Sequence, residues 1–170
     1  TGSDQVADCI DCGAGKYLPA TGSDEAADCI DCTAGKYVEE TGSDEAGDCI
    51  DCVAGTYVEA TGSDRASDCI NCAAGQYVED TGSNAASDCI DCIAGQFGKR
   101  SEGHSGSVGH PVCQACPEGK FQNMTAATSC SGCVRGRYQA SDSSTSCNAC
   151  SVGKYGRNSN LERNAENTAC

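Results

Sequence analysis

Residues 21–40, TGSDEAADCIDCTAGKYVEE, are one copy of a unit that repeats with a period of 20 residues. The opening T-G-S-D of this unit, which becomes T-G-S-N in the last copy, recurs at Thr1, Thr21, Thr41, Thr61 and Thr81. Repetition at a fixed short period is typical of repeat proteins, in which each unit is too small to fold alone and is stabilised by its neighbours. We therefore expect a tandem array in which each module contacts only the modules beside it.

Every copy carries a C-x-x-C pair, which is followed by a glycine and then by an aromatic residue. This pattern continues beyond about Gly98, where the copies diverge in length. The cysteine pairs are Cys9/Cys12, Cys29/Cys32, Cys49/Cys52, Cys69/Cys72, Cys89/Cys92, Cys113/Cys116, Cys130/Cys133 and Cys147/Cys150. The aromatic residues, which are all eight in the chain, are Tyr17, Tyr37, Tyr57, Tyr77, Phe97, Phe121, Tyr138 and Tyr155. Because every large ring occupies the same repeated position, we expect the rings to serve the architecture rather than a unique site.

The composition argues against a conventional enzyme core. Leu, Ile, Val and Phe together make up only 19 of the 170 residues, which is below the proportion found in ordinary globular proteins. The 17 cysteines instead indicate a fold held by disulfides, as in small extracellular domains. The sequence has no apolar run of the length, about 18 residues, that a membrane-spanning helix needs.

Charge is unevenly distributed along the chain. Residues 1–100 carry 20 acidic and 5 basic side chains, whereas residues 101–170 carry 5 acidic and 6 basic ones. A basic stripe is absent, so we expect no nucleic-acid partner. The acidic half attracts cations or basic surfaces. Its surplus of acidic side chains is explained more simply as a solvated face that keeps the protein soluble.

Cysteine spacing predicts that the second cysteine of each C-x-x-C pairs with the first cysteine of the next. The predicted bridges are Cys12–Cys29, Cys32–Cys49, Cys52–Cys69, Cys72–Cys89, Cys92–Cys113, Cys116–Cys130, Cys133–Cys147 and Cys150–Cys170. Cys9 is left over, and we expect its partner in an upstream repeat of a longer protein. Closing a loop of about 18 residues contributes roughly 3 kcal/mol, so eight bridges can replace an apolar core. Two alternatives remain: disulfides within each C-x-x-C, and zinc bound at the C-x2-C-x16-C-x2-C spacing of a zinc ribbon.

The local sequence predicts short hairpins and little or no helix. Gly, Ser, Thr and Asp interrupt each unit every few residues, and no helical apolar period survives. We expect A-G-x-Y-V-E to form a strand of about six residues, T-G-S-D to form a turn and D-C-I-D-C to form the returning strand. Each ring should then pack against the disulfide that closes its own loop. The expected fold is small, disulfide-rich, mostly β or irregular, and arranged as an elongated rod of hairpin modules.

Three segments follow from the spacing of the repeats. Residues 1–98 hold five near-identical repeats, residues 99–112 form an insertion or joint rich in Ser, Gly and His, and residues 113–170 hold divergent repeats. His104 and His110 could form a zinc site with Cys113 and Cys116, but two solvated histidines in a flexible loop are the simpler explanation.

Few other residues are candidates for a site. Asn123 opens the only N-x-(S/T) sequon, which makes it a glycosylation candidate in a secreted protein. Threonines of the T-G-S-D turns are weaker candidates for O-linked sugars. Calcium is a less favoured ligand of the repeated acids Asp24, Asp28 and Asp31, because their spacing matches no known calcium loop. No Ser/His/Asp constellation or unique pair of carboxylates indicates catalysis, so we expect neither an enzyme nor a cofactor.

The chain resembles the tandem ephrin-receptor-like cysteine-rich repeats of extracellular proteins, including arrays in algae and other protists, and the modules of tumour necrosis factor receptors. The resemblance rests on C-x-x-G-x-Y followed by a polar loop and C-x-x-C, and it covers nearly the whole chain. The matching segments are Cys12-Gly13-Ala14-Gly15-Lys16-Tyr17 through Cys29, and Cys116-Pro117-Glu118-Gly119-Lys120-Phe121 through Cys130. In the receptor modules such a loop is closed by a disulfide between its two ends, as in the pairing predicted above.

The resemblance implies secretion, an elongated shape and a binding or structural role. The near-identity of the first five units departs from the receptors, whose modules differ to suit their ligands. We therefore expect a structural or spacer element of an extracellular filament, flagellar hair, surface appendage or cell wall. Its expected partners are copies of itself, other matrix or appendage proteins, and glycans. A ligand-binding receptor or adhesin ectodomain is the alternative, with its binding surface in the divergent half.

Overall fold

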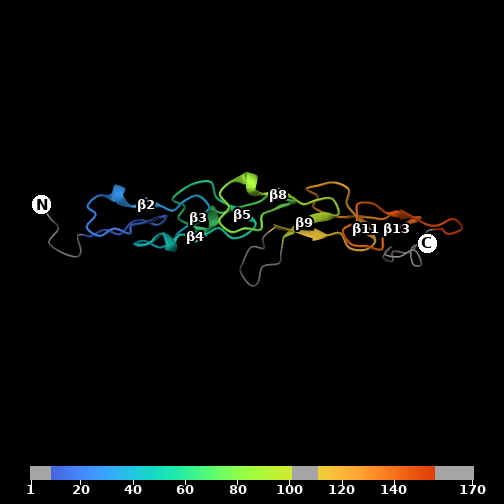
Figure 1. Ribbon diagram of the computed structural model, residues 1–170, viewed down its shortest axis with the longest axis horizontal. Helices are drawn as coiled ribbons and strands as arrows, with labels where there is room; N and C mark the ends of the chain where they lie inside the picture. The colour runs from blue at the N-terminus through green and yellow to red at the C-terminus, as the bar shows by residue number, and fades with distance from the viewer. Residues whose placement is uncertain (1–8, 101–110, 156–170) are drawn as a thin grey trace. The chain divides into compact units, whose positions relative to one another are not determined.

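The structure, a computed structural model, describes residues 9–100 and 111–155 (Figure 1). The chain divides into two compact units, which are considered separately. Unit 1 comprises residues 1–71 and 78–88, and unit 2 comprises residues 72–77 and 89–170. No helix in the described part of the chain is long and apolar enough to cross a membrane.

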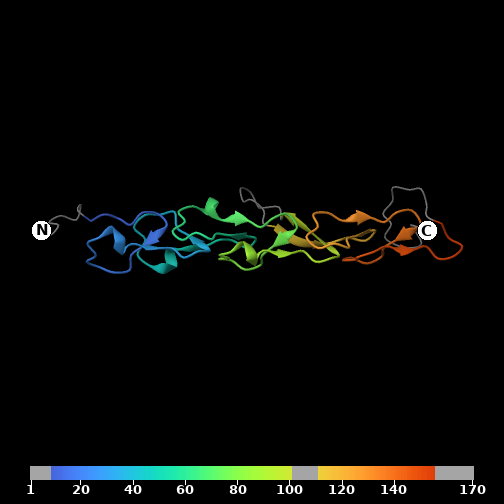
Figure 2. The same ribbon diagram turned by 90° about the horizontal axis from the view of Figure 1, so that it is seen from above.

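Unit 1 is built from two-stranded antiparallel hairpins that follow one another in chain order (Figures 1 and 2). They are β1 (Lys16–Tyr17) with β2 (Ile30–Asp31), β3 (Lys36–Tyr37) with β4 (Ile50–Asp51), and β5 (Thr56–Tyr57) with β6 (Ile70–Asn71). In each hairpin the tyrosine lies opposite an isoleucine, as Tyr37 lies opposite Ile50. The predicted hairpin in each repeat is therefore present, and the small, disulfide-rich, mostly β fold is confirmed.

The strands are two residues long, not six as expected from A-G-x-Y-V-E. The glycine before each strand has a positive φ, 87° at Gly35, and such a conformation cannot be part of an extended strand. After the tyrosine, the backbone bonds to other repeats instead of continuing the hairpin. The Val38 N–H donates to the Ser63 carbonyl at 3.2 Å, for example. Bonding between repeats therefore limits the length of each hairpin.

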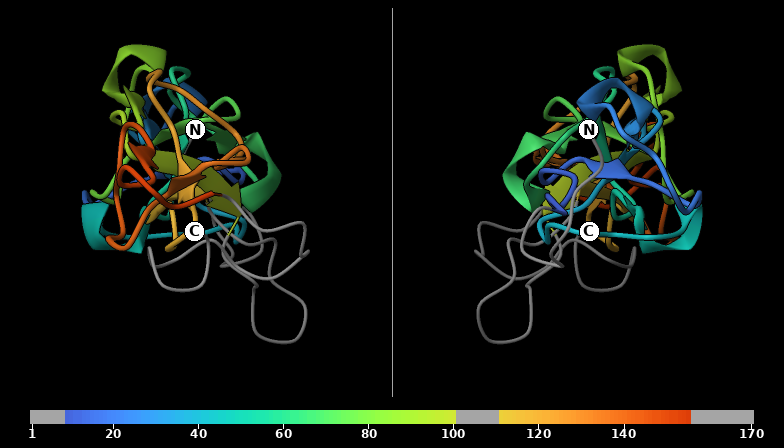
Figure 3. Two further views of the ribbon diagram at one scale, coloured as in Figure 1. Left: turned by 90° about the vertical axis from the view of Figure 1, so that its right-hand side faces the viewer. Right: turned by 90° about the vertical axis from the view of Figure 1, so that its left-hand side faces the viewer.

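The loop between the strands of each repeat contains a 3-10 helix, which the sequence did not lead us to expect. These helices are η2 (Ala26–Asp28), η3 (Ala46–Asp48), η4 (Ala66–Asp68) and η5 (Ala86–Asp88). Seen end on, they lie at the periphery of unit 1 and project to different sides (Figure 3). Successive repeats in this unit are therefore turned relative to one another.

Repeats in unit 1 are joined by the same backbone hydrogen bonds at intervals of 20 residues. The glycine before each strand donates to the valine carbonyl of the following repeat: Gly15 to Val38, Gly35 to Val58 and Gly55 to Val78, at 2.8 to 2.9 Å. In the opposite direction, the glycine of each T-G-S turn donates to a cysteine carbonyl of the preceding repeat: Gly42 to Cys12, Gly62 to Cys32 and Gly82 to Cys52. Each repeat is therefore completed by backbone groups of its neighbours.

Contacts also reach two repeats along the chain, which corrects the expectation that each module touches only those beside it. Each repeat is taken here to begin at the buried second cysteine of a C-x-x-C pair. Gly15 then lies in the repeat of residues 12–31, and Gly62 lies in the repeat of residues 52–71. A Cβ atom at Gly15 would overlap the Gly62 carbonyl oxygen, and one at Gly35 would overlap that of Gly82. The glycine is needed here both for its positive φ and for this close approach.

Unit 2 contains the remaining hairpins of the described chain. They are β7 (Gln76–Tyr77) with β8 (Ile90–Asp91), β9 (Gln96–Arg100) with β10 (Pro111–Ala115), β11 (Lys120–Phe121) with β12 (Ser131–Gly132), and β13 (Arg137–Tyr138) with β14 (Asn148–Ala149). The expected insertion at residues 99–112 thus begins and ends in the paired strands β9 and β10, where Lys99 lies opposite Val112.

Cysteine and valine form the buried interior. The most buried cysteines are Cys32, Cys52, Cys92 and Cys116, each with 0% exposure, and the buried valines are Val38, Val58 and Val78. The isoleucines opposite the tyrosines are about half exposed, as Ile50 is at 52%. Interior packing is therefore distributed in small clusters along the chain and does not form one central core.

Candidate functional site

A disulfide closes the loop of each repeat. The seven bridges among the described residues are Cys12–Cys29, Cys32–Cys49, Cys52–Cys69, Cys72–Cys89, Cys92–Cys113, Cys116–Cys130 and Cys133–Cys147. They join the same cysteines as the pairing inferred from spacing. The predicted partner of Cys150, Cys170, lies outside the described residues, and Cys9 is exposed with a free thiol.

Among the described residues, this pairing takes up the cysteines on which the zinc alternatives depend and leaves only Cys9 free. Cys113 and Cys116 bond to Cys92 and Cys130, and His104 and His110 lie outside the described residues. No disulfide forms within a C-x-x-C pair in the part of the chain that is described. Within residues 9–100 and 111–155, no three His, Cys, Asp or Glu side chains are grouped to hold a metal ion.

The aromatic side chains are mostly half-buried, and the structure shows the packing of one of them in detail. Seven of the eight are half-buried, and Tyr155 is 80% exposed. Tyr17 packs against a cluster of Cys32, Val38 and Cys49. Its ring therefore covers the disulfide of the next repeat, whereas the sequence led us to expect contact with its own bridge, Cys12–Cys29. The ring joins one disulfide loop to the next.

Many of the repeated acids have structural partners. The Asp48 carboxylate accepts hydrogen bonds from the N–H groups of Asp44 and Glu45 at 3.0 and 3.2 Å, and Asp68 and Asp88 brace their turns in the same way. Asp51 forms an ion pair with Lys36 at 2.6 Å, and Asp31 forms one with Lys16. Asp28 occupies the same place in η2 as Asp48 does in η3. These roles account for part of the acidic surplus without a bound cation.

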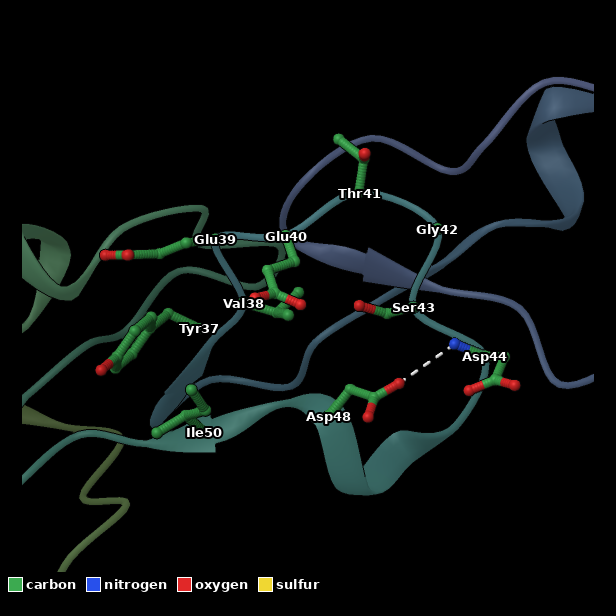
Figure 4. A pocket seen from close by; sticks show the side chains of 10 residues that line it. All are labelled: Tyr37, Val38, Glu39, Glu40, Thr41, Gly42, Ser43, Asp44, Asp48 and Ile50. Atoms are coloured by element: carbon green, nitrogen blue, oxygen red, sulfur yellow. Dashed lines mark hydrogen bonds between the residues drawn. The ribbon is translucent and has the colours of Figure 1, made fainter.

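Each of two hairpins in unit 1 has a pocket between its strands and the turn and 3-10 helix that connect them. The first has a volume of about 470 Å³ and is lined by residues 37–44, Asp48 and Ile50 (Figure 4). Tyr37 and Ile50, which face each other across β3 and β4, form its apolar wall. Glu40 and Ser43 point toward one another, Asp48 faces them from the opposite side, and Glu39 points away (Figure 4).

The second pocket recurs 20 residues later, with a volume of about 750 Å³. Tyr57 and Ile70 replace Tyr37 and Ile50, Ser63 replaces Ser43, and Asp68 replaces Asp48. Ala60 stands where the first pocket has Glu40. The two pockets thus share an aromatic wall, a serine and an aspartate, but the first has one more carboxylate.

Asn123 lies exposed in the loop between β11 and β12. Its neighbour Met124 donates its N–H to the Gln122 side chain at 3.1 Å, and Gln122 in turn donates to the Ser129 carbonyl at 2.8 Å. The sequon therefore lies on a braced and accessible turn. Glycosylation of Asn123 remains a prediction.

Sequence reasoning did not anticipate the pockets. Each pocket combines a strand, a turn and a 3-10 helix, and its shape depends on a helix that no periodicity indicated. The available signal was the pattern of Tyr, T-G-S-D, Asp and Ile at a constant spacing. That pattern could show that the same side chains recur, but not that they surround a common space.

The chain matches the model of a known protein family. The model of the family described as "tyrosine-protein kinase ephrin type A/B receptor-like" matches residues 21–69, 41–89 and 119–160. The matched segments cover more than half of the chain and fall on both the regular and the divergent repeats. No curated protein matches the chain.

Proposed function

Because this chain belongs to the ephrin-receptor-like family of cysteine-rich repeats, we propose that it is a load-bearing spacer in an extracellular filament, surface appendage or cell wall. Repeats of this family are non-catalytic receptor-type domains, and a ladder of disulfides is typical of extracellular and cell-surface proteins. The proposal adds a mechanical role to this general assignment.

The observation that supports it is the covalent path along the repeats. Cys29 and Cys32 belong to successive bridges and are separated by only two residues, as are Cys49 and Cys52. Tension on the chain therefore passes across a disulfide, along a short link and across the next disulfide. The loop residues, including the two pockets and the 3-10 helices of the regular repeats, lie off this path and carry none of the load.

The covalent path sets a limit on extension. A bridge spans 5.7 Å between the Cα atoms of Cys32 and Cys49, and the three-residue step to the next bridge adds about 10 Å when fully extended. A reduced repeat of 20 residues could extend to about 70 Å. Disulfides thus keep each repeat short under forces that would unfold a chain without them.

Single-molecule force spectroscopy of the oxidised and reduced protein tests this role. In the presence of a reductant, each regular bridge, whose cysteines have a sequence separation of 17, should lengthen the chain by about 55 Å. The bridges Cys116–Cys130 and Cys133–Cys147, with a separation of 14, should each lengthen it by about 45 Å. The oxidised protein should show neither step. Equal extension of the oxidised and reduced chains would contradict the load-bearing role.

The extracellular setting is tested separately. Antibodies raised against the purified protein should label a surface appendage, filament or wall in thin sections of cells that produce it. Labelling confined to the cytoplasm would contradict the assignment to such a structure, whatever the outcome of the force measurements.

A further inference from the structure

The two pockets of unit 1 have the chemistry of a site for a cation that carries an apolar stem. Each combines a half-buried tyrosine ring and a half-exposed isoleucine with carboxylates. No Lys, Arg or His is among the residues that line either pocket. An aromatic face attracts a cation and also packs against a methylene chain, so both walls favour the same kind of ligand.

The carboxylates of the first pocket are only partly used by the protein. Asp48 binds two backbone N–H groups through one oxygen, Oδ2, and Glu39 accepts a hydrogen bond from the Ala66 N–H outside the pocket. The ion pairs of the described chain leave Glu40 and Asp44 unmatched. Glu40 points into the pocket (Figure 4). The negative charge is therefore directed at a space that no basic side chain enters.

A buried hydroxyl group gives a second, independent indication of a ligand. Ser63, which lines the second pocket, is only 6% exposed. Its backbone carbonyl accepts the Val38 N–H, but its hydroxyl has no hydrogen-bond partner among the described residues. The equivalent Ser83 hydroxyl donates to the Asp80 carbonyl at 3.5 Å. A buried hydroxyl without a partner is unfavourable, and a donor entering the pocket would satisfy it.

We propose that these pockets bind the lysine side chains of a basic polypeptide. The ammonium group lies among the carboxylates and donates to the serine hydroxyl, and the methylene stem packs between the tyrosine and the isoleucine. The 20 acidic and 5 basic side chains of residues 1–100 attract such a partner over a longer range. Anionic ligands are disfavoured by the same charge. This binding role is separate from load-bearing, because the pockets lie in the loops that tension bypasses.

Titration of the oxidised chain, residues 1–170, with hexalysine, followed residue by residue in amide NMR spectra, tests the proposal. Shifts should concentrate at the two pockets, around Ser43 and Ser63. Hexalysine with acetylated side chains, which lacks the charge but keeps the stems, should cause none of these shifts. Equal shifts with the acetylated peptide, or shifts spread evenly over the acidic repeats, would overturn the proposal.

A matched pair of variants distinguishes binding of hexalysine at a defined site from its general attraction to the acidic repeats. Glu40 lines the first pocket, whereas Glu45 is an exposed acid that lines neither pocket. Glu40→Gln should weaken hexalysine binding at the first pocket about threefold and leave the second unchanged, because one partly exposed ion pair contributes that much. Glu45→Gln should change binding at either pocket by less than about 1.5-fold. Equal weakening by both variants would show attraction to net charge only.

Ser63→Ala adds a test that does not alter charge. It should weaken hexalysine binding at the second pocket while the first pocket keeps its affinity, which would act as an internal control. Unchanged affinity at the second pocket would contradict the role of the hydroxyl. Amide spectra of each variant before titration would establish that the fold is retained.

Discussion

The regular and divergent loops differ in length and in the way they are braced, yet they use the same backbone bonds. Regular bridges such as Cys52–Cys69 have a sequence separation of 17, whereas Cys116–Cys130 and Cys133–Cys147 have a separation of 14. The regular loop contains a 3-10 helix braced by an aspartate, such as Asp68. The shorter loops contain no helix in the described residues.

In the divergent loops a glutamine takes over the bracing. The Gln139 side chain donates to the Ser146 carbonyl at 2.7 Å and accepts from the Ser141 N–H at 3.1 Å. Gln122 makes the corresponding bonds in its own loop. Gln139 follows the aromatic residue, in the position where the regular repeats have a buried valine, and it is itself buried. A loop without a 3-10 helix thus exchanges apolar burial for two side-chain hydrogen bonds.

Backbone bonds are unaffected by this exchange. In unit 2 the Gly119 N–H donates to the Gln139 carbonyl at 2.8 Å, which matches the bond from Gly35 to Val58 in unit 1. Ser143 donates to the Cys116 carbonyl, as Gly62 does to that of Cys32. The comparison shows that this fold depends on a backbone frame, onto which different loops can be placed.

The largest expected effect distinguishes two glycines with the same backbone conformation. Gly35 and Gly136 both have positive φ, 87° and 73°. A Cβ at Gly35 would overlap the Gly82 carbonyl, whereas one at Gly136 would meet nothing within 4 Å. Gly35→Ala should lower the local free energy of unfolding by about 3 kcal/mol, from strain and overlap together. Gly136→Ala should lower it by about 1 kcal/mol, from strain alone.

Native-state hydrogen exchange on the oxidised protein measures both effects. The informative amides are those of Val38 and Cys52 for the first variant and Cys150 for the second, because each takes part in a backbone bond of the affected repeat. Equal losses of protection would contradict the close approach between repeats that are two apart.

The prediction of intermediate size compares the side chains that stabilise the two kinds of loop. Gln139→Val gives a divergent loop the residue that the regular repeats have at this position. The short loop then loses both hydrogen bonds of the Gln139 side chain. We expect a loss of about 2 kcal/mol. Asp68→Ala removes an exposed brace from a regular loop and should cost about 1 kcal/mol. Exchange rates of the Ser141 and Arg65 amides report these changes, and a stabilising Gln139→Val would show that the valine position is equivalent in both loops.

The smallest effect concerns turn residues that differ between the regions. Gly62 and Gly82 have φ of 70° and 72°, and the residues with the same backbone bond in the divergent loops, Ala126 and Ser143, also have positive φ, 52° and 56°. Ser143→Gly should therefore stabilise its loop by about 1 kcal/mol, because glycine adopts this conformation without strain. Melting of the variant and parent, both oxidised, measures the change. A lower melting temperature would mean that the serine side chain contributes more than its backbone strain costs.

Much of the fold could be predicted because it follows from local sequence. The hairpin of each repeat was predicted from the tyrosine segment and D-C-I-D-C, and Tyr17 does lie opposite Ile30. The cysteine spacing gives the same seven pairs that the structure contains, because a single rule accounts for all of them. The 3-10 helices were missed because three residues such as Ala46–Asp48 are too few to show a period.

Contacts between repeats could not be predicted in the same way. They depend on how far each repeat is turned relative to the last, which no pattern within one repeat specifies. The position of the Tyr17 ring on the Cys32–Cys49 bridge and the approach of Gly15 to Gly62 both follow from that rotation. The pockets were missed for a different reason: part of each wall is a turn and a 3-10 helix, which no periodicity in the sequence indicates. For the candidate site, the sequence alone identified the recurring side chains but could not show that they line a common pocket.

The approach of Gly15 to Gly62 also sets an order of events during synthesis. Cys29, which closes the first described loop, is made 17 residues after Cys12, whereas Gly62 follows Gly15 by 47 residues. At about 5–20 residues per second, several seconds separate the two. A disulfide loop can therefore close while the surface that will cover it has not yet been made. The newest repeats of the growing chain therefore lack part of their contacts, and their glycine backbones stay uncovered until the turns two repeats later have been made.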